Sequence, residues 1–101
     1  MIESDFQARL IKELKRRYHG CIVIKTDPTY IQGLPDLLIL YKDKWAALEV
    51  KKSERARHQP NQEYYVGLMD SMSMAFFIYP ENMYEVLADL DCHFVGHFLN
   101  G

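Results

Sequence analysis

The sequence of 101 residues predicts a single α/β domain in which helices flank a mixed β-sheet. Three observations lead to this fold class. The opening segment has apolar residues at helical spacing, two strand-like runs are joined by a short polar turn, and a fully apolar run follows in the second half. The expected order of elements is α-β-β-β-α-β-α. A chain of this length forms one core, which buries about 65% of the surface that the unfolded chain exposes.

The first helix is predicted over residues 2–18, where apolar side chains recur every four residues until Gly20 ends the pattern. The stripe consists of Ile2, Phe6, Leu10, Leu14 and Tyr18. Residues 21–26, CIVIKT, are rich in β-branched side chains and predict a short central strand. The next segment, residues 27–35, contains two prolines and a glycine and is expected to be a loop.

Two strands are predicted over residues 36–41 and 45–51, around a polar turn at Lys42, Asp43 and Lys44. Only a few polar residues separate the two apolar runs. We therefore expect an antiparallel β-hairpin at this point.

The second half of the chain predicts a helix, a strand and a further helix. Pro60 suits the first turn of a helix that continues to about Met69. Residues 74–79, MAFFIY, are entirely apolar and predict a strand buried on both faces. Pro80 begins a third helix that continues to about Leu90, and the pattern after it is ambiguous.

Charge is distributed unevenly along the chain, although the net charge is only −2. All 12 Lys and Arg residues precede residue 58, where they outnumber eight acidic residues, whereas the remainder carries six acidic residues and no Lys or Arg. Half of the basic residues lie within residues 42–57. Such a cluster attracts a polyanion. A solvated hairpin tip and loop is the simpler alternative.

The composition also bears on location and assembly. Cys21 and Cys92 lie far apart and form no CxxC motif, which favours a reducing, cytoplasmic setting. The chain opens with acidic residues, unlike a signal peptide, and no apolar run approaches the roughly 18 to 20 residues of a membrane span. Hydrophobic residues make up 49% of the chain, so we expect apolar surface for a partner, most simply in a homodimer.

The predicted hairpin contains three charged residues that can meet on one face. Glu49 and Lys51 are two positions apart in a strand and therefore point to the same side. A turn at Lys42–Asp43 places Asp36 opposite Glu49, and a turn at Asp43–Lys44 places it opposite Lys51. Either two-residue turn brings the three side chains together at the open end of the hairpin.

The carboxylates of Asp36 and Glu49 would repel each other if they were buried side by side. A hard divalent cation such as Mg²⁺ relieves this repulsion. A metal ion that polarises a phosphoryl oxygen and acidifies water, next to an ammonium group, is suited to phosphodiester hydrolysis. The alternative is a salt-bridged charge cluster that discourages pairing at a sheet edge.

The motif GLPD at residues 33–36, followed after a hairpin by EVK at residues 49–51, resembles the PD-(D/E)xK nuclease superfamily. It is most similar to the small stand-alone VRR-NUC domains of phages and bacteria, and the resemblance covers residues 3–68. It includes Gln7 in the first helix and Gln62 at the start of the second. The resemblance implies a restriction-endonuclease-like αβββαβ core, one nuclease domain over residues 1–101, and action in the cytoplasm, which for a phage protein is that of the host.

The resemblance assigns the metal site to four residues. Asp36 and Glu49, with the backbone carbonyl of Val50, would bind Mg²⁺ or Mn²⁺. Glu3 would reach the metal-bound waters or a second ion from the first helix.

Other residues would act beside the metal. Lys51 would orient the attacking water and stabilise the transition state, and Gln62 would bond to the phosphate or to the lysine. Gln7 is explained equally well as a surface position of the helix. Gly33 is expected to allow a positive φ or a close approach of the backbone before the strand.

DNA contacts are expected from the loop after the hairpin and from the loop before it. Lys52, Arg55, Arg57 and His58 would meet phosphates, although His58 could equally be a residue at the start of a helix. Tyr30 could stack on a base, although a loop tyrosine more often packs against its own protein. His93 and His97 have a spacing that would suit zinc, but without a third ligand nearby packing explains them better.

We therefore expect a Mg²⁺-dependent, structure-selective endonuclease that hydrolyses DNA at branched structures such as Holliday junctions. Little protein remains to read base edges, which favours selection by DNA shape. The resemblance implies a homodimer, and the apolar C-terminal segment is the expected dimer contact. The alternatives are a non-catalytic nucleic-acid-binding module of the same fold and a sequence-specific restriction-type nuclease.

Overall fold

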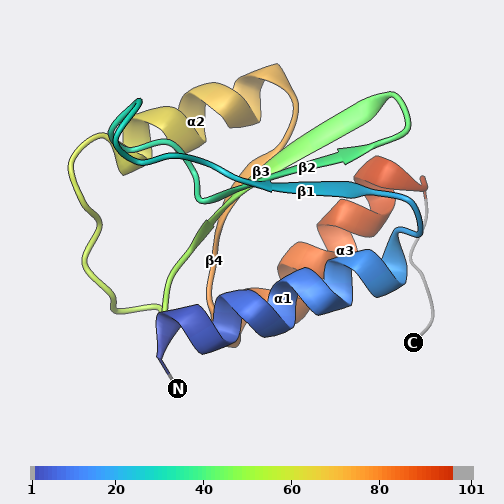
Figure 1. Ribbon diagram of the computed structural model, residues 1–101, viewed down its shortest axis with the longest axis horizontal. Coiled ribbons are helices and arrows are strands. Elements are labelled where there is room, and N and C mark those ends of the chain that lie inside the picture. Colours follow the sequence, from blue (N-terminus) through green and yellow to red (C-terminus); the bar gives the residue numbers. More distant parts are fainter. Residues whose placement is uncertain (1, 97–101) are drawn as a thin grey trace.

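The computed structural model describes residues 2–96 and has a mixed β-sheet with helices on both faces (Figure 1). The elements in chain order are α1 (Glu3–Arg17), β1 (Ile22–Lys25), β2 (Leu37–Tyr41), β3 (Lys44–Val50), α2 (Gln62–Met72), β4 (Ala75–Ile78), the 3-10 turn η1 (Pro80–Asn82) and α3 (Met83–Phe94). Helix α2 covers one face of the sheet, and α1 and α3 cover the other. The predicted fold class and order of elements are confirmed.

The strands lie in the order β1-β2-β3-β4, with antiparallel pairing of β1 with β2 and of β2 with β3, and parallel pairing of β3 with β4. The prediction that residues 21–26 form a central strand is wrong, because β1 is an edge strand. Its Ile22 and Ile24 are 57% and 41% exposed. β-Branched composition indicates a strand but does not distinguish an edge from a centre.

The hairpin of β2 and β3 has the first of the two predicted registers. The turn consists of residues 42–43, and Leu37 pairs with Leu48. The next position outward therefore places Asp36 opposite Glu49. Strand β3 has a neighbour on each side, and its residues 46–50 are all buried.

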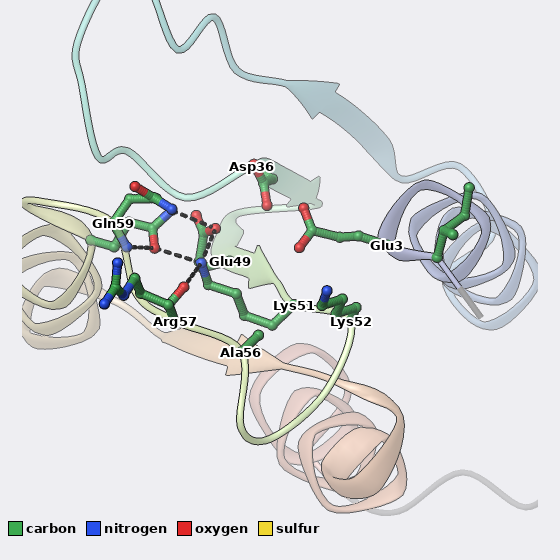
Figure 2. Close-up of a pocket in the computed structure, with 10 residues that line it drawn as sticks. Glu3, Asp36, Glu49, Lys51, Lys52, Ala56, Arg57 and Gln59 are labelled. Carbon is green, nitrogen blue, oxygen red and sulfur yellow. Dashed lines mark hydrogen bonds and ion pairs between the residues drawn. The ribbon is translucent and has the colours of Figure 1, made fainter.

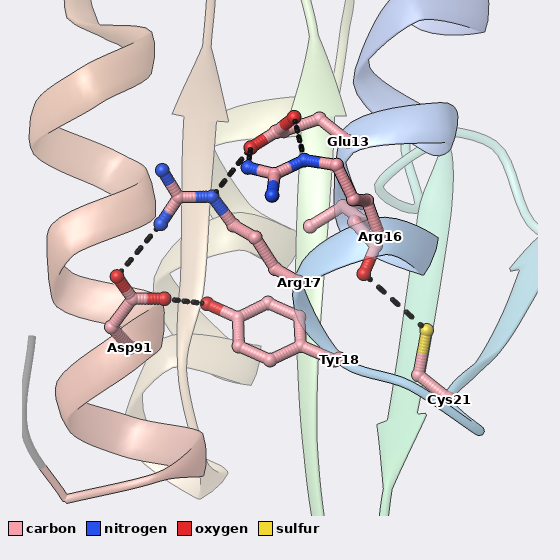
Figure 3. A network of polar contacts seen from close by, with 7 residues as sticks. Glu13, Arg16, Arg17, Tyr18, Cys21 and Asp91 are labelled. Atoms are coloured by element: carbon pink, nitrogen blue, oxygen red, sulfur yellow. Dashed lines mark hydrogen bonds and ion pairs between the residues drawn. The ribbon is translucent and has the colours of Figure 1, made fainter. Parts of the chain in front are cut away.

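The main core lies between the sheet and the helices α1 and α3. It contains Phe6, Leu10 and Leu14 of α1, Leu37, Ile39, Leu48, Val50 and Ile78 of the sheet, and Val86, Leu87, Leu90 and Phe94 of α3. A buried polar network joins the two helices (Figure 3). Asp91 of α3 accepts hydrogen bonds from the hydroxyl of Tyr18 and, at 2.7 Å, from Nη1 of Arg17. Burial, followed by the bond to Asp91, raises the pKa of Tyr18.

Helix α2 forms a smaller cluster on the opposite face, where Val66 packs with Ala47 and Ala75. The helix begins at Gln62, so Pro60 lies before it, and it ends at Met72. The predicted start is therefore wrong by two residues. Asn61 precedes the helix with a left-handed backbone, φ 70°, which interrupts helical geometry after Pro60.

Strand β4 and α3 also differ in detail from the prediction. Residues 74–79 were expected to be buried on both faces, but β4 is the other edge of the sheet and its Phe76 and Phe77 are half-buried. Pro80 begins η1, and α3 then continues to Phe94. Within residues 2–96, no helix has both the length and the apolar character needed to span a membrane.

Candidate active site

A pocket of about 680 Å³ lies at the open end of the β2–β3 hairpin (Figure 2). The N-terminus of α1, the ends of β2 and β3, and the loop of residues 51–61 surround it. Its lining residues are Ile2, Glu3, Asp36, Glu49, Lys51, Lys52, Ala56, Arg57, Gln59 and Gln62. All five residues expected to be catalytic, namely Asp36, Glu49, Lys51, Glu3 and Gln62, therefore line one pocket.

Asp36 and Glu49 approach each other from paired strands. Glu49 is only 2% exposed, and Oδ2 of Asp36 accepts a hydrogen bond of 2.9 Å from the backbone N–H of Val50. Burial raises the pKa of Glu49 to about 8. Repulsion by Asp36 adds to this increase, as does the hydrogen bond that a protonated Glu49 can donate to Asp36. Near neutral pH, the pair therefore favours binding either a proton or a cation.

One oxygen of Glu49 lacks a hydrogen bond. Oε2 accepts a bond of 2.9 Å from Nε2 of Gln62, whereas Oε1 is buried and, when Glu49 is ionised, receives no hydrogen bond from any donor among residues 2–96. An ionised oxygen without a partner in a buried position carries a large desolvation penalty, which a bound cation would remove.

The donors at this site are carboxylate oxygens, which suit Mg²⁺ or Mn²⁺. No group of three His, Cys, Asp or Glu residues in the described part of the chain is placed to bind a metal ion. Mg²⁺ is commonly held by one or two carboxylates and keeps several waters, so the pair of Asp36 and Glu49 fits it.

Val50 and Glu3 are the other two residues predicted to hold the metal. The backbone N–H of Val50 donates to Asp36, but Val50 is fully buried and is not among the residues that line the pocket. Glu3 reaches from the first turn of α1 toward Asp36 (Figure 2). Its negative charge contributes, as a smaller cause, to the raised pKa of Glu49.

Lys51 is fixed inside the pocket and is 5% exposed. Its Nζ donates to the backbone carbonyl of Arg57 at 3.1 Å and to Oε1 of Gln62 at 2.7 Å, and it lies 3.8 Å from Oε2 of Glu49. These contacts hold a positive charge beside the carboxylate pair.

Gln62 connects the acidic and basic parts of the site. Its Nε2 donates to Glu49, and its Oε1 accepts both from Lys51 and, at 2.8 Å, from the backbone N–H of Gln59. The sequence pattern could not reveal the contributions of the Arg57 carbonyl and the Gln59 N–H, because backbone groups carry no residue signature.

Of the residues expected to contact DNA, some line the pocket and others lie outside it. Lys52 is exposed at the rim of the pocket, and Arg57 also lines it. Arg55 is exposed in the same loop but does not line the pocket. Tyr30 is 82% exposed on the loop before β2 and also lies outside the lining.

Two further histidines have structural contacts. His58 stacks on Phe77 at 4.0 Å between ring centroids, and its Nδ1 lies 3.0 Å from Oε1 of Glu63. Helix α2 begins only at Gln62, so His58 is not a residue at the start of that helix, and its contact with DNA stays a prediction. Nε2 of His93 lies 3.0 Å from the backbone carbonyl oxygen of Trp45, as expected for a packed residue. Its proposed zinc partner, His97, lies outside the described residues.

Comparison of the chain with protein-family models, curated proteins and solved structures finds no match.

Proposed function

We propose that the protein is a divalent-metal-dependent endonuclease that hydrolyses DNA phosphodiester bonds. The observation that carries the proposal is the buried Oε1 of Glu49, which has no hydrogen-bond partner within the described chain, beside Asp36 and next to a fixed ammonium. The resemblance of the GLPD and EVK motifs to PD-(D/E)xK nucleases supports the same function.

The resemblance implies a role for each residue, and its contacts are compatible with that role. Asp36 and Glu49, with the carbonyl of Val50, would hold Mg²⁺ or Mn²⁺. When bound, such an ion polarises a phosphoryl oxygen and lowers the pKa of water. Lys51 orients the attacking water and stabilises charge that develops on the phosphate. Gln62 keeps that ammonium in place.

Glu3 acts from the opposite wall of the pocket. From the start of α1 its carboxylate points toward Asp36, and there it would contact metal-bound waters or a second ion.

Substrate binding depends on the basic loop beside the pocket. Lys52 and Arg57 line the pocket, and Arg55 lies exposed in the same loop. These three side chains would therefore neutralise DNA phosphates. In the described residues, no separate element is available to enter a groove and read bases. We therefore propose selection of branched DNA, such as a Holliday junction. The free thiols of Cys21 and Cys92 support our proposal of a reducing, cytoplasmic setting.

Two active sites on one symmetric dimer would suit paired cuts at a junction, so we also propose a homodimer. The expected contact at the C-terminus lies partly outside the described residues, and Phe94 packs in the protein's own core. Sedimentation equilibrium tests this proposal, and a monomer at the concentration of the cleavage assay would rule out the dimer.

The function is tested with labelled four-way junction, flap and linear duplex, each with Mg²⁺ or EDTA. Wild-type protein should cut branched DNA only with Mg²⁺, whereas K51A and D36N should be inactive. K44A is the matched control, because Lys44 is an exposed lysine at the far end of the hairpin. Full activity in K51A or D36N would contradict the assignment of the site.

The same substrates separate the alternatives. A non-catalytic module would bind the junction and leave it intact at every Mg²⁺ concentration. A restriction-type nuclease would cut a linear plasmid into discrete bands and show no preference for branches.

A further inference from the structure

The loop before β2 and the start of α2 meet at Gly33 and Asn61. A Cβ atom added to Gly33 would lie 2.6 Å from Cβ of Asn61, 2.8 Å from its backbone carbonyl carbon and 3.0 Å from its backbone oxygen. The first two separations are shorter than real Cβ atoms show, the third is unusually tight, and two of the three atoms belong to the backbone. Only glycine therefore permits this approach.

Both residues have backbone conformations that ordinary side chains disfavour. Gly33 has φ +94° and Asn61 has φ 70°, in the left-handed region that glycine and asparagine tolerate best. Asn61 makes no side-chain hydrogen bond that caps α2. We therefore attribute the role of Asn61 to its left-handed backbone conformation and not to capping of the helix.

The contact joins two segments that each carry part of the site. Asp36 follows Gly33 by three residues and accepts the N–H of Val50, and Gln62 directly follows Asn61 and bonds to Glu49 and Lys51. A shift at the contact would move Asp36 relative to Gln62. It would thereby change the placement of Asp36 against Glu49 and Lys51, to which Gln62 is bonded.

We propose that Gly33 and Asn61 are positioning residues, whose close backbone contact sets the placement of Asp36 against the network of Gln62, Glu49 and Lys51. The effect on metal binding and cleavage rests on the proposed function. The effect on geometry does not, so the two are measured separately.

The first comparison is G33A against G20A. Gly20 also has a positive φ, +89°, but an added Cβ there meets no atom within 4 Å among the described residues, so G20A introduces backbone strain without a clash. We expect G33A to lose hydrogen-exchange protection at the Val50 amide and to shift the side-chain amide resonances of Gln62. G20A should keep both signals.

The second comparison is N61V against N61G, which remains informative if G33A does not fold. Asn61 is exposed, so neither change disturbs the core. Glycine keeps the left-handed conformation, whereas a β-branched residue resists it. We expect N61V to shift the Gln62 resonances and N61G to leave them unchanged.

Mn²⁺ titration by calorimetry gives the functional readout. We expect binding to weaken about 10- to 100-fold in G33A and N61V, as is typical when the supports of metal ligands are lost, and to remain near wild type in G20A and N61G. The proposal is overturned if G33A and N61V keep the wild-type amide signals, or if the matched controls lose them equally. If wild-type protein binds no Mn²⁺ and cuts no DNA, the proposed function fails while the amide comparison still decides the positioning role.

Discussion

Replacing Glu49 by glutamine should make the metal-free protein more stable at alkaline pH. The pKa of Glu49 is raised from 4.5 to about 8, mainly by burial. The folded protein therefore keeps a proton that the unfolded chain has lost. The resulting stability is fully present below pH 4.5 and is lost as the pH rises through about 8.

The size of this loss of stability follows from the two pKa values of Glu49, in the unfolded and in the folded protein. A change from 4.5 to about 8 corresponds to a loss of about 5 kcal/mol in the free energy of unfolding between acid and alkaline pH. Since Glu49 is 2% exposed, solvent screening reduces this little. Small domains have total stabilities of about 5 to 15 kcal/mol, so the loss should be readily measurable.

The assay is urea unfolding in EDTA, followed by the fluorescence of Trp45, the single tryptophan. Wild type and E49Q are compared at several pH values between about 5 and about 9. Groups that titrate equally in both proteins cancel in the difference, which should grow in favour of E49Q as the pH rises. Parallel pH profiles for the two proteins would refute the argument that burial keeps Glu49 protonated.

Three other changes should have distinct effects. Mg²⁺ should raise the melting temperature of wild type at alkaline pH but not that of D36N, because a bound cation replaces the lost proton; a thermal melt with and without EDTA measures this. Y18F should lower the free energy of unfolding by about 1 to 3 kcal/mol, since the buried Asp91 loses a donor, while the Mg²⁺-induced rise in melting temperature stays as in wild type. If Y18F lost the Mg²⁺-induced rise in melting temperature as D36N does, the result would contradict a purely structural role for Tyr18. R57A should weaken DNA binding and reduce the dependence of log Kd on log salt by about one, and an unchanged salt dependence would show that Arg57 makes no phosphate contact.

The geometry of the hairpin site could be predicted because a strand has strict alternation. A two-residue turn leaves two registers, with Asp36 opposite Glu49 or opposite Lys51, and the pairing of Leu37 with Leu48 in the structure selects the first. The face shared by Glu49 and Lys51 follows in the same way, and both line the pocket.

Other features depend on contacts that sequence does not encode locally. Strands β1 and β4 are rich in apolar residues, yet both are edges, because only the packing order of the sheet decides which strand has two neighbours. The start of α2 was misplaced because Asn61 adopts a left-handed conformation beside Gly33, across a separation of 28 residues.

The position of β3 has a consequence for how the candidate site comes apart on heating. This strand bonds to a neighbour on each side, and it carries Glu49 and leads directly into Lys51. Interior strands open only when the whole domain melts, whereas termini and loops fray at far lower energetic cost. Glu49 should therefore keep its place until cooperative denaturation, whereas Glu3, in the first turn of α1, should detach from the site at a lower temperature.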